Sequence, residues 1–226
     1  MINFKTISAI AVTAAVVAIV PIGNAEAALI TGVTASTNMG SSNGYNIQNI
    51  VNGSGLSSLS LTATHTTQSA SNSWVSNLGI GTGNIDFNLN GQYSLQGFSF
   101  WNFNDSSDFF NNINVFGIQG VNISTSLDGS TYSALSGAPT QFAIGTYAPE
   151  SPEQFAFAPT LANYVRLSVL SNYYGEYPLA AFNEVQFDGT PATAPTAVPT
   201  PALLPGLIGL GVAALRKRKA EAASKA

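Results

Sequence analysis

Side chains that could do acid–base, nucleophilic or metal chemistry are scarce in this chain. His65 is the single histidine, and no residue is a cysteine. A hydrolytic triad needs a base beside its nucleophile, and a zinc site with one histidine and no cysteine would depend on carboxylates. A glycosidase needs two opposed carboxyl groups, and Asp105 and Asp108 lie in a stretch rich in Ser, Asn and Phe. We therefore expect a protein that is not an enzyme.

The charge of the chain excludes a further class of function. Between residues 29 and 190 the single base Arg166 stands against nine acids, a formal charge of −8. Nucleic-acid binding needs clustered Lys and Arg for the phosphates, so we expect no nucleic-acid partner. The absence of cysteine excludes a disulfide framework. Most other polar residues are Asn, Ser, Thr and Gly, which suit solvated strands and turns and also suit sugar hydroxyls.

Apolar and polar residues alternate in short segments, which is the pattern of strands with one buried face. Residues 85–89 and 164–169 show this alternation clearly, and turn formers such as Asp128-Gly129 separate the segments. No long helical periodicity lies between them. The pattern predicts an all-β antiparallel β-sandwich. Arg166 falls on the outer face of its strand, where we expect it to pair with an acid such as Glu184.

Short motifs in this region resemble the discoidin-like, galactose-binding-like domains, which include coagulation-factor type C domains and many bacterial carbohydrate-binding modules. The sharpest motif is Ser126–Tyr132, a strand end and hairpin turn that leads to an aromatic residue. Other matching pieces are Val33–Ser36, Ile50–Gly53, Trp74, Ile85–Leu89, Tyr164–Leu167 and Phe182–Val185. The resemblance covers most of residues 29–189. It implies a non-catalytic jelly roll of about eight strands that binds ligands with loops at one end.

The same resemblance implies a structural calcium between an early loop and the last strand. The candidate ligands are Asn52, Ser54, Ser57 and Glu184. Calcium takes about six to eight oxygens, several of them anionic, and only Glu184 would bring a full charge. We therefore expect a weak site completed by backbone carbonyls. The alternative is a metal-free loop with Glu184 on a wet strand face.

Sugar-binding members of that family stack an aromatic ring on a sugar face and hold the hydroxyls with polar groups. A tyrosine supplies both stacking area and a hydroxyl at low entropic cost. The stretch 172–178 is favoured because its tyrosines lie beside Gly and Pro in an expected loop. The candidate ligand-binding residues are Tyr173, Tyr174, Tyr177, Glu176, His65, Asn102 and Asn104. Packing in the core or at its rim is the alternative for each of them.

Residues 1–27 have the plan of a secretory signal peptide. Lys5 gives the positive start, Ile7–Val20 is apolar, and Ala25-Glu26-Ala27 matches a cleavage site. We expect a signal helix that is removed, which leaves residues 28–189 as the sandwich domain of an exported protein. A retained membrane anchor is the alternative.

A second targeting signal is expected at the C-terminal end. Residues 190–201 form a Pro/Thr/Ala linker, and residues 198–219 combine the motif Pro199-Thr200-Pro201-Ala202, the apolar segment Leu203–Leu215 and the basic cluster Arg216–Lys219. As a helix the apolar segment would be about 20 Å long, against roughly 30 Å for a hydrocarbon core.

This order of features resembles the PEP-CTERM class of bacterial sorting tails, in a Pro-Thr-Pro-Ala variant. The resemblance implies transient residence in the inner membrane, processing by an exosortase-like membrane protease, and a final place at the cell surface or outside the cell. An uncut C-terminal anchor is the alternative.

These features together predict an exported, surface-sorted, non-catalytic carbohydrate-binding protein of the cell envelope or extracellular polysaccharide matrix. The acidic charge of the domain favours a neutral glycan. The alternative is a structural or adhesion matrix protein whose sandwich self-associates or acts as a spacer without binding glycan.

Overall fold

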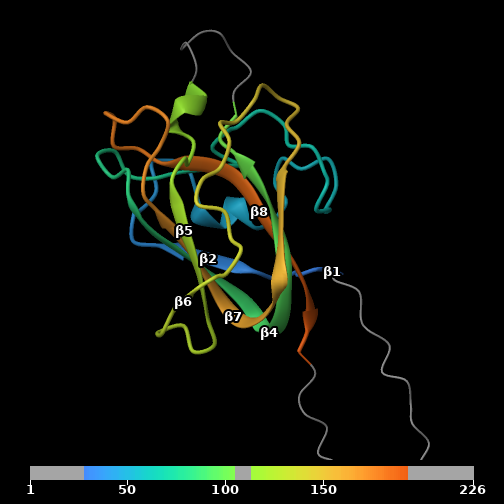
Figure 1. Cartoon of the computed structure of the whole chain (residues 1–226). Coiled ribbons are helices and arrows are strands. Elements are labelled where there is room, and N and C mark those ends of the chain that lie inside the picture. Colours follow the sequence, from blue (N-terminus) through green and yellow to red (C-terminus); the bar gives the residue numbers. More distant parts are fainter. Residues whose placement is uncertain (1–27, 105–112, 193–226) are drawn as a thin grey trace, which may run out of the picture. The chain divides into compact units, whose positions relative to one another are not determined.

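A computed structural model describes residues 28–104 and 113–192 of the chain (Figure 1). The expected signal helix, the sorting motif and the C-terminal helix lie outside these ranges, as do Asp105 and Asp108. Within the described ranges, no helix is long and apolar enough to cross a membrane.

Strands make up most of the regular structure, as the alternating pattern predicts. The strands are β1 Ala28–Leu29, β2 Thr34–Thr37, β3 Trp74–Val75, β4 Gly83–Asn102, β5 Val121–Ser126, β6 Ser133–Ala134, β7 Glu153–Val169 and β8 Ala181–Pro191. Two short 3-10 helices, η1 Ile47–Ile50 and η3 Ile113–Phe116, lie in the connections.

The two long strands β4 and β7 organise the fold. They pair antiparallel from Gly83 opposite Val169 to Phe100 opposite Glu153. The register shifts twice on the way, once across the turn-forming pair Asn90-Gly91, where Asn90 takes a φ of 57°. Each shift breaks the regular ladder, which allows one pair of strands to take part in both layers of a sandwich.

The remaining strands attach to opposite halves of this pair. The first half of β4 also pairs with β2, and the last part of β7 pairs with β5, which continues to β6. This gives one layer in the order β2-β4-β7-β5-β6. On the other side β8 runs beside β4, and β1 and β3 pair with different parts of β8.

A single large apolar core fills the space between the layers. Ile85, Phe87 and Leu89 are fully buried, as their alternation predicts. The ring of Phe100 stacks on Phe142 with centroids 3.8 Å apart, and on Phe182 at 5.0 Å. Each buried side chain of this size stabilises the fold by about 1.5–3 kcal/mol. The expected antiparallel β-sandwich is confirmed.

Candidate functional site

A cluster of aromatic side chains joins the loop between β7 and β8 to η3. The strands β7 and β8 that this loop connects are labelled in Figure 1. Phe116, Tyr174 and Tyr177 form this aromatic cluster. Tyr174 and Tyr177 keep 53% and 41% of their surface exposed. The Phe116 ring lies 5.9 Å from the Tyr174 ring and 5.5 Å from the Tyr177 ring, and the two tyrosines meet edge to face at 6.2 Å. Exposed tyrosine rings held by other rings offer an apolar face and a polar tip to a ligand.

The buried side chain of Asn172 fixes the loop that carries the two tyrosines. Its Nδ2 donates to the carbonyls of Tyr177 and Leu179 at 2.8 and 2.6 Å, and its Oδ1 accepts from the Gly175 N–H at 2.8 Å. Gly175 has a φ of 70°, a conformation that favours glycine. The Tyr174 N–H also donates to the carbonyl of Val115, which ties the loop to η3. The rings are therefore held in place before any ligand arrives, which lowers the entropic cost of binding.

A hollow of about 300 Å³ opens beside Tyr177. Its lining comes from the loop before β4 and the loop after β7, and includes Thr82, Ser171, Asn172 and Pro178. This size is at the lower end of the range for small-molecule sites. An aromatic ring at the rim of a hollow lined by hydroxyl and amide groups matches the chemistry of a sugar, which has apolar ring faces and peripheral hydroxyls.

Two other candidates in the same loop have different environments. Tyr173 is half-buried, and its hydroxyl donates to the carbonyl of Phe142. Burial, and then the charge of Glu153, raise the pKa of Tyr173. Its hydroxyl is thus used within the protein, so a role of Tyr173 in ligand binding stays a prediction for its ring alone. Glu176 is exposed on the loop.

Three further candidates are structural rather than ligand-facing. His65 has no exposed surface, and its Nδ1 and Nε2 lie 2.7 and 3.0 Å from the carbonyls of Thr66 and Ser54. Burial lowers its pKa.

Asn102 and Asn104 are equally enclosed. Asn102 donates to the carbonyls of Ile118 and Ala143, and Asn104 accepts from the Gln68 N–H and donates to Thr66. These three predictions were wrong because buried backbone groups between strands need partners, and these side chains supply them.

The expected partner of Arg166 was also wrong. Arg166 lies directly opposite Asp86 in the β4–β7 register, and its Nε and Nη2 contact the two carboxylate oxygens at 2.6 and 3.0 Å. Glu184, the acid named from the sequence, lies on β8 and has no exposed surface. The sequence could not distinguish the two acids because strand register is a tertiary property.

The calcium candidates converge only in part. The Gly53 N–H donates to Glu184 Oε1 at 3.1 Å, so the early loop and the last strand do meet. Glu184 Oε2 is buried without a partner. However, Asn52 Oδ1 accepts from the Ser54 N–H, and Ser57 Oγ accepts from the Thr64 N–H. These two oxygens are therefore already used in part by the loop itself.

The charge of the loop also differs from that of a usual calcium site. Desolvation by burial raises the pKa of Glu184 to about 8, so the folded site without a cation favours the protonated acid at neutral pH. No group of three or more His, Cys, Asp or Glu side chains that could hold a metal occurs in the described part of the chain. Glu184 is the one anionic group among the candidate calcium donors, so a site here would depend on neutral oxygens and backbone carbonyls. The alternative of a wet strand face for Glu184 was wrong, because its side chain is buried.

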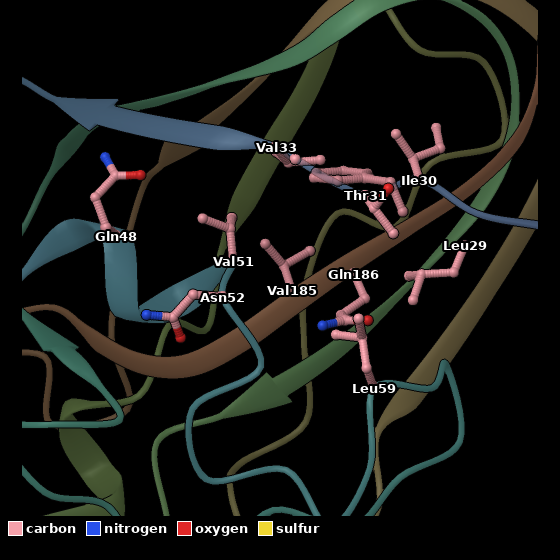
Figure 2. A pocket seen from close by; sticks show the side chains of 12 residues that line it. Leu29, Ile30, Thr31, Val33, Gln48, Val51, Asn52, Leu59, Val185 and Gln186 are labelled. Carbon is pink, nitrogen blue, oxygen red and sulfur yellow. The ribbon is translucent and has the colours of Figure 1, made fainter.

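An apolar pocket of about 240 Å³ lies beside this loop. Figure 2 shows its lining, which includes Ile30, Val33 and Val185 together with Asn52 and Gln186. Gln186 is buried, donates to Glu184 Oε1 at 3.0 Å, and leaves its own Oε1 without a partner. The one aromatic lining residue, Phe187, is 2% exposed, so this pocket offers no ring face to a sugar.

The stretch Gly40–Gly44 has the G-x-S-x-G spacing of a hydrolase nucleophile turn, a match that the sequence reasoning missed. In the structure the Ser42 hydroxyl donates to the carbonyl of Ser76 at 2.7 Å. Both ring nitrogens of His65 face carbonyls of other residues. The spacing therefore does not assemble a serine–histidine pair.

Phe116 is the other residue that the sequence reasoning missed. No sequence motif includes Phe116. It contacts the tyrosines only because η3 packs against a loop that lies more than fifty residues further along the chain. An aromatic residue next to a turn was the available signal, and it is too common to identify a site alone.

No family model matches this chain, and no curated protein matches it. Similar solved structures include the module named GH31 CBM32-2 bound to GalNAc, at 16% identity and a TM-score of 0.48 over 69% of this chain and 95% of the module. Another is the family 32 carbohydrate-binding module of Clostridium perfringens NanJ in complex with galactose, at 11% identity and a TM-score of 0.47 over 72% and 99%.

A third similar structure is a family 89 glycoside hydrolase from Clostridium perfringens, at 18% identity and a TM-score of 0.45. The match covers 73% of this chain but spans only 15% of the length of the hydrolase. Carbohydrate-binding modules are the class that the sequence motifs resemble. The sandwich itself is established by the strand pairing described above.

Proposed function

We propose that this chain is a non-catalytic glycan-binding protein and that the aromatic cluster is its main contact surface. The observation that carries the proposal is the exposure of Tyr174 and Tyr177 on a loop that Asn172 holds in one conformation. A folded domain gains little by leaving two large rings in solvent, whereas a stacking site requires them there.

A neutral glycan suits the charge of the domain. Residues 29–190 carry one base against nine acids, so an anionic polysaccharide would be repelled. Within the described ranges, Arg166 is the one Lys or Arg residue, and Asp86 already pairs with it. Glu176, exposed on the tyrosine loop, provides a carboxylate that can accept from sugar hydroxyls.

The direct test is a glycan array followed by titration calorimetry on the full chain. Galactose and GalNAc, the sugars named with the modules above, are convenient first probes beside larger neutral oligosaccharides. We expect saturable binding that the Tyr174→Ala/Tyr177→Ala double variant weakens at least about tenfold, because each exposed anchor ring is worth about 1 kcal/mol or more. The thermal unfolding temperature of the double variant should stay close to that of the wild type.

A blank array together with concentration-dependent oligomers would instead favour the structural or adhesion role. The double variant separates these outcomes further. If it abolishes oligomers and the wild type binds no glycan, the aromatic cluster is a self-association surface and the glycan proposal is refuted.

We further propose that the protein is exported and sorted to the cell surface or extracellular matrix. Two features of the sequence support this, the signal-peptide plan of residues 1–27 and the ordered tail of residues 198–219. Processing by an exosortase-like membrane protease at Pro199–Ala202 predicts a mature protein without the basic cluster. Mass spectrometry of the secreted protein tests this, and a C-terminus that retains Lys219 would contradict it.

A further inference from the structure

The outer face of the β2–β4–β7 layer carries polar side chains in aligned rows. The two central rows, read across β2, β4 and β7, are Ser36–Asp86–Arg166 and Thr34–Asn88–Tyr164. They alternate along the strands with buried residues such as Ala35, Phe87 and Val165. The apolar set faces the core, so the polar set faces solvent.

The Asp86–Arg166 pair is fixed in geometry but remains open to solvent. Both carboxylate oxygens are engaged by the guanidinium, and the two side chains are 30% and 29% exposed. The Tyr132 ring lies over the guanidinium carbon, 4.0 Å from the ring centroid. Each carboxylate oxygen can accept a second hydrogen bond, so the pair retains capacity for a ligand.

The hairpin between β5 and β6 positions Tyr132. Asp128 Oδ1 accepts from the N–H groups of Ser130 and Thr131 at 2.8 Å each, which lowers the pKa of Asp128 to about 2. Gly129, with a φ of 73°, packs on the Tyr164 ring so closely that a Cβ there would lie 3.2 Å from a ring carbon. The motif that stood out in the sequence, Ser126–Tyr132, therefore brings a rigid turn and a ring over the polar face.

A hollow of about 330 Å³ lies on this face, between the edge strand β2 and the hairpin. Its lining is polar and aromatic: Thr34, Ala35, Ser36, Asp86, Asn88, Gly129, Tyr132 and Tyr164. The hydroxyls of Thr34 and Ser36 are on exposed residues and have no hydrogen-bond partner among the described residues. Two free hydroxyls, the Asn88 amide, whose Oδ1 accepts from the Asn90 N–H, and a carboxylate with remaining acceptor capacity surround one hollow. They match the hydrogen-bonding groups of a carbohydrate.

We propose that this hollow is a second carbohydrate-binding site, which takes a neutral oligosaccharide through Asp86, Asn88 and the hydroxyls of Thr34 and Ser36. Arg166 acts as a positioning residue that holds the Asp86 carboxylate. An anionic ligand fits poorly, because Asp86 already neutralises Arg166, and the described residues include no Lys and no other Arg. The site shares no residue with the aromatic cluster, so it stands independently of the function proposed above.

Stability alone accounts poorly for this arrangement. A partly exposed ion pair contributes little to the free energy of unfolding, even when its geometry is good. The hydroxyls of Thr34 and Ser36 also make no hydrogen bond to the described part of the fold. Their removal should therefore change ligand binding without changing the unfolding temperature.

The test compares two variant sets of the full chain on an array of neutral oligosaccharides and by calorimetry with the strongest hit. The loop set is Tyr174→Ala/Tyr177→Ala. The sheet set is Thr34→Val/Ser36→Ala, alone and combined with Asp86→Asn. Asn122→Ala is the matched control, because Asn122 is exposed on β5 in the same layer, lies outside the hollow, and has no side-chain bond among the described residues.

We expect the loop set to keep weaker binding through the second site. Adding the combined sheet set to the loop set should weaken this remaining binding by about tenfold or more, while Asn122→Ala binds as the wild type. Wild-type affinity and stoichiometry in the combined sheet set would overturn the second site and leave the loop site intact. Loss of binding in the sheet set alone would support the second site and count against the loop site. No binding by the wild type would overturn both. If Asp86→Asn unfolds the chain, the Thr34→Val/Ser36→Ala pair decides the question.

Discussion

Two sets of polar residues differ in their exposure to solvent. One is the loop 172–178, and the other is the group of His65, Asn102 and Asn104. In the loop a buried amide, Asn172, bonds to the backbone so that two tyrosines can stay in solvent. In the second group the amides and the imidazole are themselves buried, and all their bonds go to the protein. The difference teaches that a polar residue marks a ligand site only when the protein leaves its bonding groups unused.

The largest effect we expect comes from Glu184, a buried acid with an unpartnered oxygen. Burial raises its pKa from 4.5 to about 8, and raises that of Glu150 to about 7. Between pH 4.5 and the raised pKa of each acid, the folded state holds a proton that the unfolded chain has released. The free energy of unfolding therefore falls as the pH rises through this window. Glu184 alone accounts for a loss on the order of a few kcal/mol between about pH 4.5 and pH 8.

Chemical denaturation across that pH window measures the effect. Glu184→Gln should make the slope shallower, because an amide does not titrate, while Glu150 still contributes. Glu176→Gln, a change on the exposed loop, is the matched control and should leave the slope as in the wild type. A wild-type stability that rises with pH through this window would contradict the prediction.

The next largest effect should come from Asn102→Ala. The change removes three bonds, to the carbonyls of Ile118 and Ala143 and from the Phe103 N–H, and the Ile118 and Phe103 groups are then buried without these bonds. We expect the free energy of unfolding to fall by about 3 kcal/mol. Asn122→Ala, an exposed amide on β5, should cost less than about 0.5 kcal/mol by the same denaturation measurement. Equal losses of stability in Asn102→Ala and Asn122→Ala would contradict the distinction between buried, bonded amides and exposed ones.

Adjacent tyrosines provide a finer test of the same distinction. Tyr173→Phe removes only a hydroxyl that donates to Phe142, so we expect a loss of about 1 kcal/mol in stability and unchanged glycan affinity. Tyr174→Ala should do the reverse, with weaker binding and little change in stability. Calorimetry and thermal unfolding on the two variants measure both quantities, and a binding loss in Tyr173→Phe would show that the inner ring also serves the site.

The smallest effect concerns calcium, which stays a prediction from the sequence. A cation would favour the ionised form of Glu184, so any stabilisation by millimolar calcium should be larger at pH 9 than at pH 6. For so weak a site we expect less than about 1 kcal/mol, lost in Glu184→Gln. Thermal unfolding with calcium and with a chelator measures it. No shift at either pH would show that the loop is metal-free.

The sequence by itself determined the layered β architecture. Alternation at Ile85, Phe87 and Leu89 fixed which side chains are buried, because successive side chains of a strand point to opposite faces. It also indicated the loop 172–178, because Gly175 and Pro178 disfavour a continued strand. The convergence of the Gly53 loop with Glu184 followed from the family resemblance and is present in the structure.

Only the tertiary structure decided which polar groups are free. The pairing of Arg166 with Asp86 depends on register, and the burial of His65 depends on loops that are distant along the chain. Phe116 joins the tyrosines across two separate connections, and the Ser126–Tyr132 turn gains a possible role only where Tyr132 lies over Arg166. Local spacing fixes the direction of a side chain within a strand or turn, but only the packing of distant segments decides whether a ligand can reach it.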